Sequence, residues 1–434
     1  MTEAGQRKNM AGQPRTVARH GRLKRRQPFS TVFGLVATAL VVAVVSVGSV
    51  GAITASTLKS NIDTIKLSPA DEGTAKKQDI NAIKGGANIL LIGSDSRVGQ
   101  AAEKEDAEGA RNDVTMLVHI SEDHSQVTVV SFPRDTMVPI PACTNPDTGE
   151  SSYAQSKAMI NTALGEGGPN GGVACVVKTV ENLTGLSIPY AGLITFDGVI
   201  SMSNALGGVT VCIAKPIHDG TFLNLPAGEV PLKGDDALAF LRTRHGVDDG
   251  SDVARISNQQ VFLSAMLRKL TSDGALSNPI TLYKFASAAT SNMTLSEGLN
   301  DTGTLVSLAA AVRNTNTSNM LLVQYPTVED PANVNRLVVS QDAAHSLNVA
   351  LQKDVRTQIA DGAIGRGAVV SPSESPKPNA DSTEAPNTTQ PPTDNGSDPS
   401  DGTSDGQDAK NPTALPSSIT GQNAAEQTCS KGSN

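Results

Sequence analysis

The 434-residue sequence contains no tryptophan, and aromatic side chains make up only 3% of it. In a chain with 39 glycines and 24 prolines, this shortage indicates that part of the sequence never enters a hydrophobic core. Cysteine is scarce as well, because the chain has only four. At this length, four cysteines exclude a small domain held together mainly by disulfides. The chain is long enough to form one full-sized hydrophobic core.

A surplus of positive charge is also missing, since 35 Lys and Arg residues face 43 Asp and Glu residues. Nucleic-acid binding driven by overall charge is therefore excluded, and no nucleic-acid partner is expected. The exception is the N-terminal arm, residues 1–26, which carries eight Arg and Lys residues and a single acid. This uneven distribution predicts that the arm and the rest of the chain occupy two compartments.

Charged residues are absent from Pro28 to Leu58. This stretch can cross about 30 Å of hydrocarbon as a helix, so we predict a retained transmembrane anchor. A cleaved signal peptide is the alternative, because the small residues from Ser49 to Ala52 resemble a cleavage site. Since the basic arm precedes the span, the positive-inside rule predicts a single-pass protein of the cell membrane, with a cytoplasmic N-terminus and an extracytoplasmic remainder.

Composition divides the chain into five predicted segments. They are a basic cytoplasmic arm (1–28), a transmembrane helix (29–54), a polar stalk (55–84), one extracellular globular domain (85–365) and a disordered acidic tail rich in Pro, Ser and Thr (366–434).

The globular segment alternates strand and helix patterns. Short β-branched or apolar runs bounded by turn residues predict strands at 88–93, 114–120, 127–132, 191–196 and 209–213. Helical spacing predicts helices at 173–183, at 197–207 with Asp197 as N-cap, and at 253–270. Such interleaving favours an α/β sandwich with a central sheet.

Charged residues flank three of these predicted strands, at the positions where sheet proteins place active sites. Asp95 follows the first strand, Arg111 and Asp113 precede the second, and Arg134 and Asp135 follow the third. Each group taken alone also fits a surface turn. Together, carboxylates and arginines are the residues that hold a divalent metal and a polyphosphate.

Two further motifs add basic residues. Arg242 and Arg244 lie two positions apart, and on one face of an extended segment they would repel unless an anion sat between them. Arg255 and Gln259 lie four positions apart on one face of the predicted helix, a spacing that also fits a solvated face. Because the sequence has neither a P-loop nor a Gly-rich dinucleotide fingerprint, a nucleotide is not the expected phosphate donor.

The charged motifs stand within or beside five ordered blocks that together resemble the LytR-CpsA-Psr (LCP) family of Gram-positive bacteria: 88–97, 111–120, 127–136, 196–211 and 237–245. The resemblance covers roughly residues 85–270 and points to an actinobacterial source. It implies a three-layer α-β-α sandwich with a central mixed sheet. It also implies a membrane-anchored phosphotransferase that moves a glycopolymer from a polyprenyl-pyrophosphate carrier onto peptidoglycan, with Mg²⁺ or Mn²⁺ as cofactor and a pyrophosphatase side activity.

Residue roles follow from the same resemblance. It assigns the metal to Asp95 and Asp113. It assigns the pyrophosphate to Arg111, Arg134, Arg242, Arg244, Arg255 and Gln259, with Arg134, Arg242 and Arg244 stabilising the charge that develops during transfer. Asp135 is a candidate proton acceptor, and partnership with a nearby arginine is the alternative for it.

Three positions depart from the family pattern. Val114 stands where the family has threonine, so a hydroxyl near the metal is missing unless Thr115 replaces it. Met159 replaces a basic residue, with Lys157 two positions upstream, and Asn258 stands where a second helix arginine is common. Val114 and Met159 favour an alternative function, an inactive binder of polyprenyl phosphates or wall polymer. A membrane-linked transcriptional regulator is the other alternative, but a cytoplasmic arm of about 26 residues is too short for a folded DNA-binding domain.

The cysteines fit an oxidising exterior. Cys143 and Cys175 flank the Gly-rich segment 165–172 and are predicted to form a disulfide. Cys212 falls within a predicted strand and is assigned to the core, whereas Cys429 falls in the predicted tail. Zinc-binding spacing is absent, so metal ligation by cysteine is not expected.

Overall fold

The computed structural model describes residues 63–67, 86–94, 110–272, 279–300, 302–371 and 412–433. All of them belong to one of two units of the chain, Thr57–Asn434. The predicted arm (1–28) and transmembrane helix (29–54) lie outside the described residues. Within the described part, no helix is both long and apolar enough to cross a membrane.

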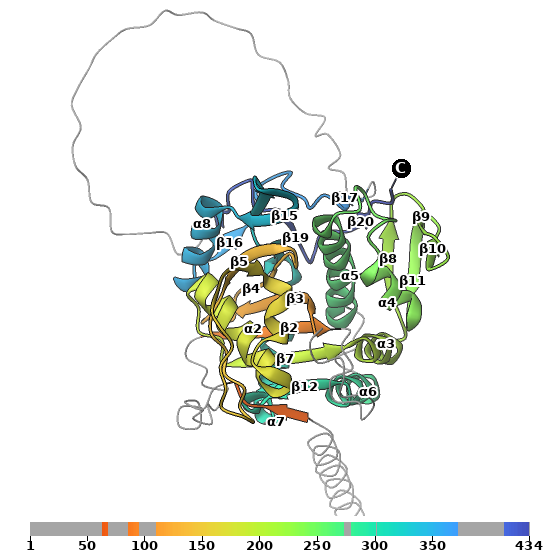
Figure 1. Ribbon diagram of the computed structural model, residues 1–434. Helices are drawn as coiled ribbons and strands as arrows, with labels where there is room; N and C mark the ends of the chain where they lie inside the picture. The colour runs from red at the N-terminus through yellow and green to blue at the C-terminus, as the bar shows by residue number, and fades with distance from the viewer. Residues whose placement is uncertain are drawn as a thin grey trace, which may run out of the picture. The chain divides into compact units, whose positions relative to one another are not determined.

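The central sheet has eight strands in the described part of the chain, with both parallel and antiparallel neighbours (Figure 1). In sheet order they are β1 (Asp63–Ile65), β12 (Met293–Ser296), β7 (Tyr190–Thr195), β2 (Ala87–Ser94), β3 (Asn112–Ile120), β4 (Val127–Ser131), β13 (Met320–Gln324) and β19 (Gly421–Asn423). The apolar strand β2 pairs antiparallel with β3 and parallel with β7. The sheet is therefore mixed, as the family resemblance implies.

Helices cover both faces of this sheet. Because successive side chains of a strand point to opposite sides, one strand can pack against both helical layers. Leu90 of β2 enters a core that includes residues of α2 (Gly168–Thr184) and α8 (Gln341–Gln352). The residue before it packs on the opposite face, against a core shared with α5 (Asp252–Ser272) and α7 (Thr302–Asn314). The result is the three-layer arrangement that the resemblance implies.

A second core surrounds a four-stranded sheet in the order β11-β8-β20-β17. Its strands are β11 (Gly228–Leu232), β8 (Val209–Ile213), β20 (Thr428–Ser430) and β17 (Ala368–Val370). Phe240 of α4 (Asp235–Arg242) is fully buried in this core, together with Phe262 of α5. Helix α5 therefore packs against both the central sheet and the second core (Figure 1).

The remaining elements connect these parts. A third sheet has the order β14 (Thr327–Asp330), β15 (Asn333–Val339), β5 (Thr136–Ile140) and β6 (Gln155–Met159). Two strand pairs are β9 (Ile217–Asp219) with β10 (Leu223–Leu225) and β16 (Thr357–Gln358) with β18 (Thr413–Ala414). The other helical segments are η4 (Ile160–Gly165), α3 (Phe196–Ala205), α6 (Pro279–Thr290), η6 (Glu297–Leu299) and η7 (Thr317–Asn319).

The five predicted strands are all present, as β2, β3, β4, β7 and β8, and two predicted helices correspond to α2 and α5. The third helix, α3, begins at Phe196, so the prediction of Asp197 as its N-cap is wrong. Thr195 is the N-cap, because its extended backbone lets the hydroxyl accept a hydrogen bond from the backbone N–H of Gly198. Asp197 occupies the first turn, where its negative charge interacts favourably with the helix dipole.

The predicted polar stalk and the predicted disordered tail both contain strands. Asp63–Ile65 of the stalk forms β1, which pairs in parallel with β12 at the edge of the central sheet. Residues 412–433 of the tail form β18, β19 and β20, and we name them the C-terminal strap. Leu415, Ile419 and Cys429 of the strap are buried. The prediction of a disordered tail is based on the polar composition of the whole segment, to which these few apolar residues contribute little.

The four cysteines form two disulfides. Cys143 bonds to Cys175, as predicted, with Cα atoms 5.4 Å apart. Cys212 bonds to Cys429, so the assignment of Cys212 to the core without a partner and of Cys429 to a disordered tail is wrong. The parallel pairing of β8 with β20 places these two residues opposite each other, although 217 positions separate them in the sequence.

Candidate functional site

The site is built around Asp252, the first residue of α5, whose side chain is only 4% exposed. Oδ1 of Asp252 lies 2.5 Å from Nη2 of Arg255 and 3.5 Å from Nη2 of Arg244. Oδ2 accepts a hydrogen bond from the backbone N–H of Arg134 at 2.9 Å. One buried carboxylate thus holds together helix α5, the segment after α4 and the turn after β4.

A second carboxylate, Asp113 of β3, joins the same group. Because β3 and β4 are antiparallel, the turn after β4 returns to the beginning of β3. Nη1 of Arg134 in that turn lies 2.5 Å from Oδ1 of Asp113, and Nη2 of Arg255 donates to the Asp113 carbonyl at 2.9 Å. We call Arg134, Arg244 and Arg255 the arginine cluster.

The arginine cluster is crowded and partly unsatisfied. Burial lowers the pKa of the Arg255 guanidinium; the nearby charges of Arg244 and Arg134 lower it further, whereas Asp252 and Asp113 raise it. Nε of Arg134 and Nε of Arg255 are buried and have no hydrogen-bond partner within the part of the chain that the structure describes. Because a buried donor without an acceptor is costly, an anion bound among these guanidinium groups would be stabilising.

Asp135 lies beside the cluster but is only loosely paired. Its Oδ1 is 3.8 Å from Nε of Arg134, and Oδ1 of Asp252 is 3.9 Å from the same atom. Both distances exceed that of a hydrogen bond. The side chain of Asp135 is 23% exposed, so its carboxylate can reach solvent or a substrate.

Arg242 is placed apart from Arg244. It is the last residue of α4 and is exposed, with its guanidinium 4.2 Å from the ring centroid of Phe196 and 5.8 Å from that of Phe222. Arg244 instead faces Asp252. The expected arrangement, two arginines on one face of an extended segment, is therefore wrong, because the helix includes the first of them. The anion that Arg244 meets is a carboxylate of the protein itself.

Gln259 is buried, and its Nε2 donates to the Leu241 carbonyl at 3.0 Å. Nδ2 of the preceding Asn258 donates to the Phe240 carbonyl at 2.7 Å. These carbonyls lie in the last turn of α4, where helix acceptors lack partners within the helix. Gln259 therefore fixes the end of the helix that carries Arg242.

The resemblance assigns two further residues to the site, Arg111 and Asp95. Arg111 is exposed, and its carbonyl accepts a hydrogen bond from the hydroxyl of Ser94 at 2.8 Å. Asp95 lies outside the described residues. Its chain neighbour Ser94 is paired with Asn112, the chain neighbour of Asp113, at the end of β2.

The two residues that could compensate for Val114 and Met159 both have other partners. The hydroxyl of Thr115 accepts a hydrogen bond from Nδ2 of Asn112 at 2.8 Å, so it is already engaged beside Val114. Nζ of Lys157 lies 2.7 Å from Oδ2 of Asp330, which lowers the pKa of that carboxyl chiefly through this hydrogen bond. Lys157 is therefore paired elsewhere and does not replace the missing basic residue.

The donor set suits a metal shared with a phosphate rather than one enclosed by protein. Among the described residues, no group of three His, Cys, Asp or Glu side chains could hold a metal ion. Asp113 offers one partly exposed carboxylate. Mg²⁺ commonly takes one or two carboxylates and completes its shell with phosphate oxygens and water, so the described residues fit such a site.

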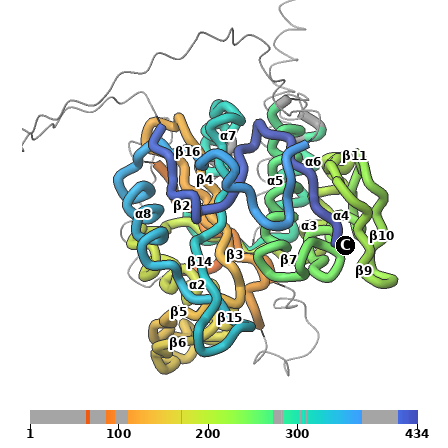
Figure 2. The backbone as a smooth tube through the Cα atoms, turned by 90° about the horizontal axis from the view of Figure 1, so that it is seen from above, coloured from red at the N-terminus to blue at the C-terminus, as the bar shows by residue number. Residues whose placement is uncertain are grey.

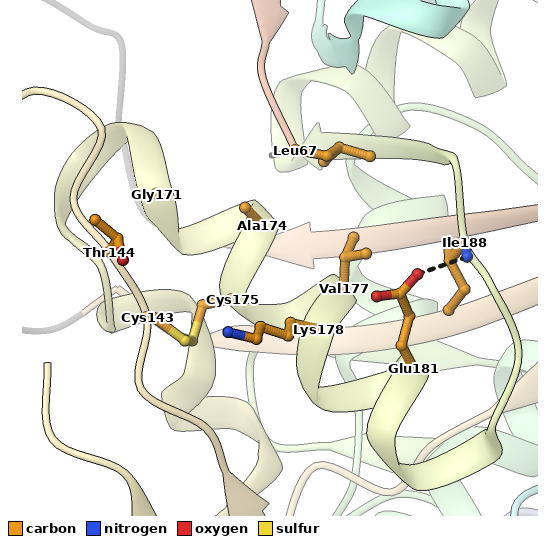
Figure 3. A pocket seen from close by; sticks show the side chains of 10 residues that line it. All are labelled: Leu67, Cys143, Thr144, Gly171, Ala174, Cys175, Val177, Lys178, Glu181 and Ile188. Atoms are coloured by element: carbon orange, nitrogen blue, oxygen red, sulfur yellow. Dashed lines mark hydrogen bonds between the residues drawn. A yellow bond between two sulfur atoms is a disulfide. The ribbon is translucent and has the colours of Figure 1, made fainter. Parts of the chain in front are cut away.

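A cavity of about 290 Å³ lies along α2, beside the first disulfide (Figure 3). Lys178 at its wall donates to the Ala142 carbonyl at 3.3 Å, and Glu181 accepts a hydrogen bond from the backbone N–H of Ile188 at 2.8 Å. The cavity shares no residue with the arginine cluster. We therefore do not assign the pyrophosphate to it.

Sequence reasoning missed Asp252, the residue on which the site depends. The available signals were an acidic residue at the start of a predicted helix and an arginine three positions later, a spacing that brings side chains together on a helix. Both signals also fit ordinary helix capping. The structure does bring together the predicted residues Asp113, Arg134, Arg244 and Arg255.

Residues 53–353 match the model of the LytR_cpsA_psr family. This is more than half of the chain, and the protein belongs to that family. The chain is 29% identical over 271 residues to the cell wall biosynthesis protein LcpA of Corynebacterium glutamicum, covering 57% of this chain and 51% of LcpA. The chain thus spans about half the length of that relative.

Two further likenesses extend this finding. The chain is 25% identical to the polyisoprenyl-teichoic acid–peptidoglycan teichoic acid transferase TagU of Enterococcus faecalis, covering 59% of this chain and 75% of TagU. A solved structure of a Streptococcus agalactiae protein superposes with a TM-score of 0.52 at 22% identity, covering 64% of this chain and 90% of that one. The latter likeness supports the fold.

Proposed function

We propose that this chain is a membrane-anchored phosphotransferase that attaches a glycopolymer from a polyprenyl-pyrophosphate carrier to peptidoglycan. The observation that carries the proposal is the arginine cluster, in which two buried guanidinium N–H groups have no hydrogen-bond partner among the described residues. Pyrophosphate oxygens are suitable acceptors, and arginine can bind them with two parallel hydrogen bonds. Membership of the LytR_cpsA_psr family and likeness to a relative named as a teichoic acid transferase support the same activity.

In the proposed mechanism, the arginine cluster binds the pyrophosphate and stabilises the charge that develops on its oxygens. A sugar hydroxyl of the acceptor attacks the phosphorus nearest the donor sugar. A new P–O bond forms to the acceptor, the bond to the bridging oxygen breaks, and polyprenyl phosphate leaves with the electron pair. Asp135 is the proposed acceptor of the hydroxyl proton, because its carboxylate is loosely paired and partly exposed.

Arg242, Arg111 and Gln259 take supporting roles in this proposal. Arg242 is exposed at the end of α4 and is the proposed contact of an outer phosphate oxygen. Arg111 is exposed and lies two residues before Asp113 in the sequence. We assign it to the pyrophosphate because the family resemblance implies this role. Gln259 acts through α4, whose end it fixes, and so holds Arg242 in place.

Asp113 and Asp95 are the proposed ligands of Mg²⁺ or Mn²⁺, which when bound would neutralise charge on the pyrophosphate. Attack by water in place of the sugar hydroxyl would give the proposed pyrophosphatase side activity. The segment 29–54 is the proposed anchor. It would keep the domain outside the cell beside its lipid-linked substrate, which is consistent with both disulfides.

The decisive experiment measures transfer of a labelled glycan from a polyprenyl pyrophosphate to peptidoglycan by the full chain in lipid vesicles. Arg134→Lys should lower the rate at least about 100-fold, because a point charge cannot replace a guanidinium that binds two oxygens. Arg366→Lys is the matched control, since Arg366 is exposed and pairs with an exposed aspartate of a neighbouring loop. A wild-type protein that binds the lipid but never transfers or hydrolyses it would establish the binder instead.

A further inference from the structure

The C-terminal strap passes from the central sheet to the second core (Figure 2). Its strand β19 pairs with β13 of the central sheet, and β20 lies between β8 and β17. Between these strands, Nη1 of Arg268 in α5 donates to the carbonyls of Ala424 and Glu426 at 3.0 and 2.9 Å. The strap is therefore bonded to both regions and to the helix that begins with Asp252.

The end of the strap holds the loop between α4 and α5, residues 243–251. The backbone N–H of Asp248 donates to the Lys431 carbonyl at 3.0 Å, and the backbone N–H of Ser433 donates to the Gly246 carbonyl at 2.9 Å. Nζ of Lys431 also lies 2.5 Å from Oδ1 of Asp248. This loop contains Arg244 of the arginine cluster and ends directly before Asp252, the buried carboxylate that Arg244 and Arg255 share.

Asp248 adopts a backbone conformation that needs such support. Its φ angle is +41°, in the left-handed region that residues other than glycine rarely adopt. A residue persists there only where its surroundings hold it. Lys431 provides both a backbone acceptor and an ammonium group to this one residue. The strap thus keeps the loop in a conformation that its own sequence does not favour.

A second connection runs through α5. The hydroxyl of Ser430 donates to Oδ1 of Asn258, and Nδ2 of Asn258 donates to the Phe240 carbonyl of α4. Asn258 is 0% exposed, so both of its bonds are made within the protein. It lies three residues after Arg255 in the same helix. The strap is therefore linked to both ends of the 243–251 loop, and an arginine in place of Asn258 would bring a charge into this closed position.

We propose that the C-terminal strap is a positioning element for the arginine cluster, and that Lys431 is the residue through which it holds Arg244 and Asp252 in place. The proposal rests on the proposed function, because the cluster is the proposed pyrophosphate site. Lys431 acts through Asp248 and the loop, and is therefore a positioning residue. The arginine cluster of the domain is thus completed by the C-terminal strap, which follows the long polar segment of the tail.

Lys431→Met in the full chain tests this proposal. We expect glycan transfer to slow about 10-fold, because small displacements of binding groups reduce rates strongly. Hydrogen exchange of residues 243–255 should become faster. The melting temperature should change little, since the ion pair is partly exposed. Lys431→Arg, which retains the charge, should restore both the transfer rate and the slow exchange.

Arg366→Met is the matched control, because Arg366 pairs with Asp249 of the same loop from outside the strap, at 3.3 Å. It should leave transfer and exchange as in the wild type. In a double variant of Lys431→Met with Asp248→Asn, exchange should be no faster than in the single variants, since both changes break the same pair.

Wild-type transfer and exchange in Lys431→Met would overturn the proposal and leave the proposed function standing. A wild-type chain that transfers no glycan would instead reject the proposed function. Hydrogen exchange then decides the structural part alone: unchanged exchange of residues 243–255 in Lys431→Met would also reject the positioning role of the strap.

Discussion

The two regions that meet at Asp252 are assembled from contacts of different range. In the central-sheet region, Arg134 reaches Asp113 across 21 residues, and the contact follows from the pairing of consecutive strands. In the second-core region, Cys212 reaches Cys429 across 217 residues. One arginine of the cluster, Arg134, therefore lies beside locally paired strands, whereas Arg244 and Arg255 lie in or beside the region that is joined by a late return of the chain.

The largest effect on transfer is expected where the two regions meet. Asp252→Asn keeps the shape of the side chain but removes the charge that Arg244 and Arg255 share. The free energy of unfolding should fall by about 3–5 kcal/mol, because two buried or partly buried guanidinium groups lose their counter-charge. Transfer should fall about 10²–10³-fold. Urea unfolding and the glycan-transfer assay measure the two effects.

Asp249→Asn is the control for this variant, because Asp249 lies three residues earlier and its side chain is 42% exposed. It should change stability by less than about 1 kcal/mol and leave transfer unaffected. Equal effects of the two substitutions would mean that Asp252 does not organise the site.

The disulfides compare the two regions directly. Replacing Cys212 and Cys429 by alanine releases a loop of 217 residues, whereas replacing Cys143 and Cys175 releases one of 32. The loop-entropy model gives losses of about 5 and about 4 kcal/mol, respectively. Calorimetry or urea unfolding of both double variants measures the difference. We also expect transfer to fall more in the first variant at a temperature where both are folded, because it frees the strap.

The reverse order of stability would contradict this comparison. So would equal residual transfer by the two folded variants, since the Cys143–Cys175 bridge lies beside the cavity along α2 and not at the arginine cluster. Reduced wild-type protein provides the reference for loss of both bridges.

Asp113→Asn tests the central-sheet half of the site. The substitution removes one charge from the proposed metal ligand and from the partner of Arg134. Transfer should fall about 10- to 100-fold, because a hard cation binds a neutral amide more weakly than a carboxylate. The free energy of unfolding should change by only about 1 kcal/mol, since the ion pair between Arg134 and Asp113 is partly exposed. The metal would be excluded from the mechanism if EDTA did not lower the activity of the wild type and the Asp113→Asn variant kept that activity.

The contrast between the regions also explains how much could be predicted from the sequence. The strands around Asp113 and Arg134 are predicted correctly because short β-branched or apolar runs bounded by turn residues mark each strand, and the structure pairs these consecutive strands with each other. The Cys143–Cys175 bridge was predicted because both cysteines flank one flexible segment. In this region, pattern and proximity in the sequence coincide.

The second-core region lacked such signals. Asp252 was not singled out, because an acidic residue in the first turn is an ordinary feature of helices. Gln259 is predicted to bind the pyrophosphate, and its hydrogen bond to the Leu241 carbonyl depends on where α4 ends, which no local pattern states. The return of Cys429 to Cys212 depends on a few apolar residues after a long polar segment. These features follow from tertiary pairing, which a single sequence does not display.

The smallest effect is expected for Lys157, which lies in the central-sheet region but outside the site. Its ion pair with Asp330 lowers the pKa of that carboxyl, so the stabilisation is present above the pKa of an unfolded aspartate, about 3.9, and is lost as the pH falls through the lower pKa of the folded state. Lys157→Met should therefore be slightly less stable than the wild type at pH 7, and the difference should shrink as the pH falls below the pKa of an unfolded aspartate, about 3.9. Unfolding curves at pH 7 and at a series of lower pH values measure this change, with Lys353→Met, at an exposed lysine of α8's C-cap, as the control. Transfer should match that of the wild type. A large loss of transfer in Lys157→Met would show that this lysine does serve the site and that its pairing with Asp330 gives way when substrate binds.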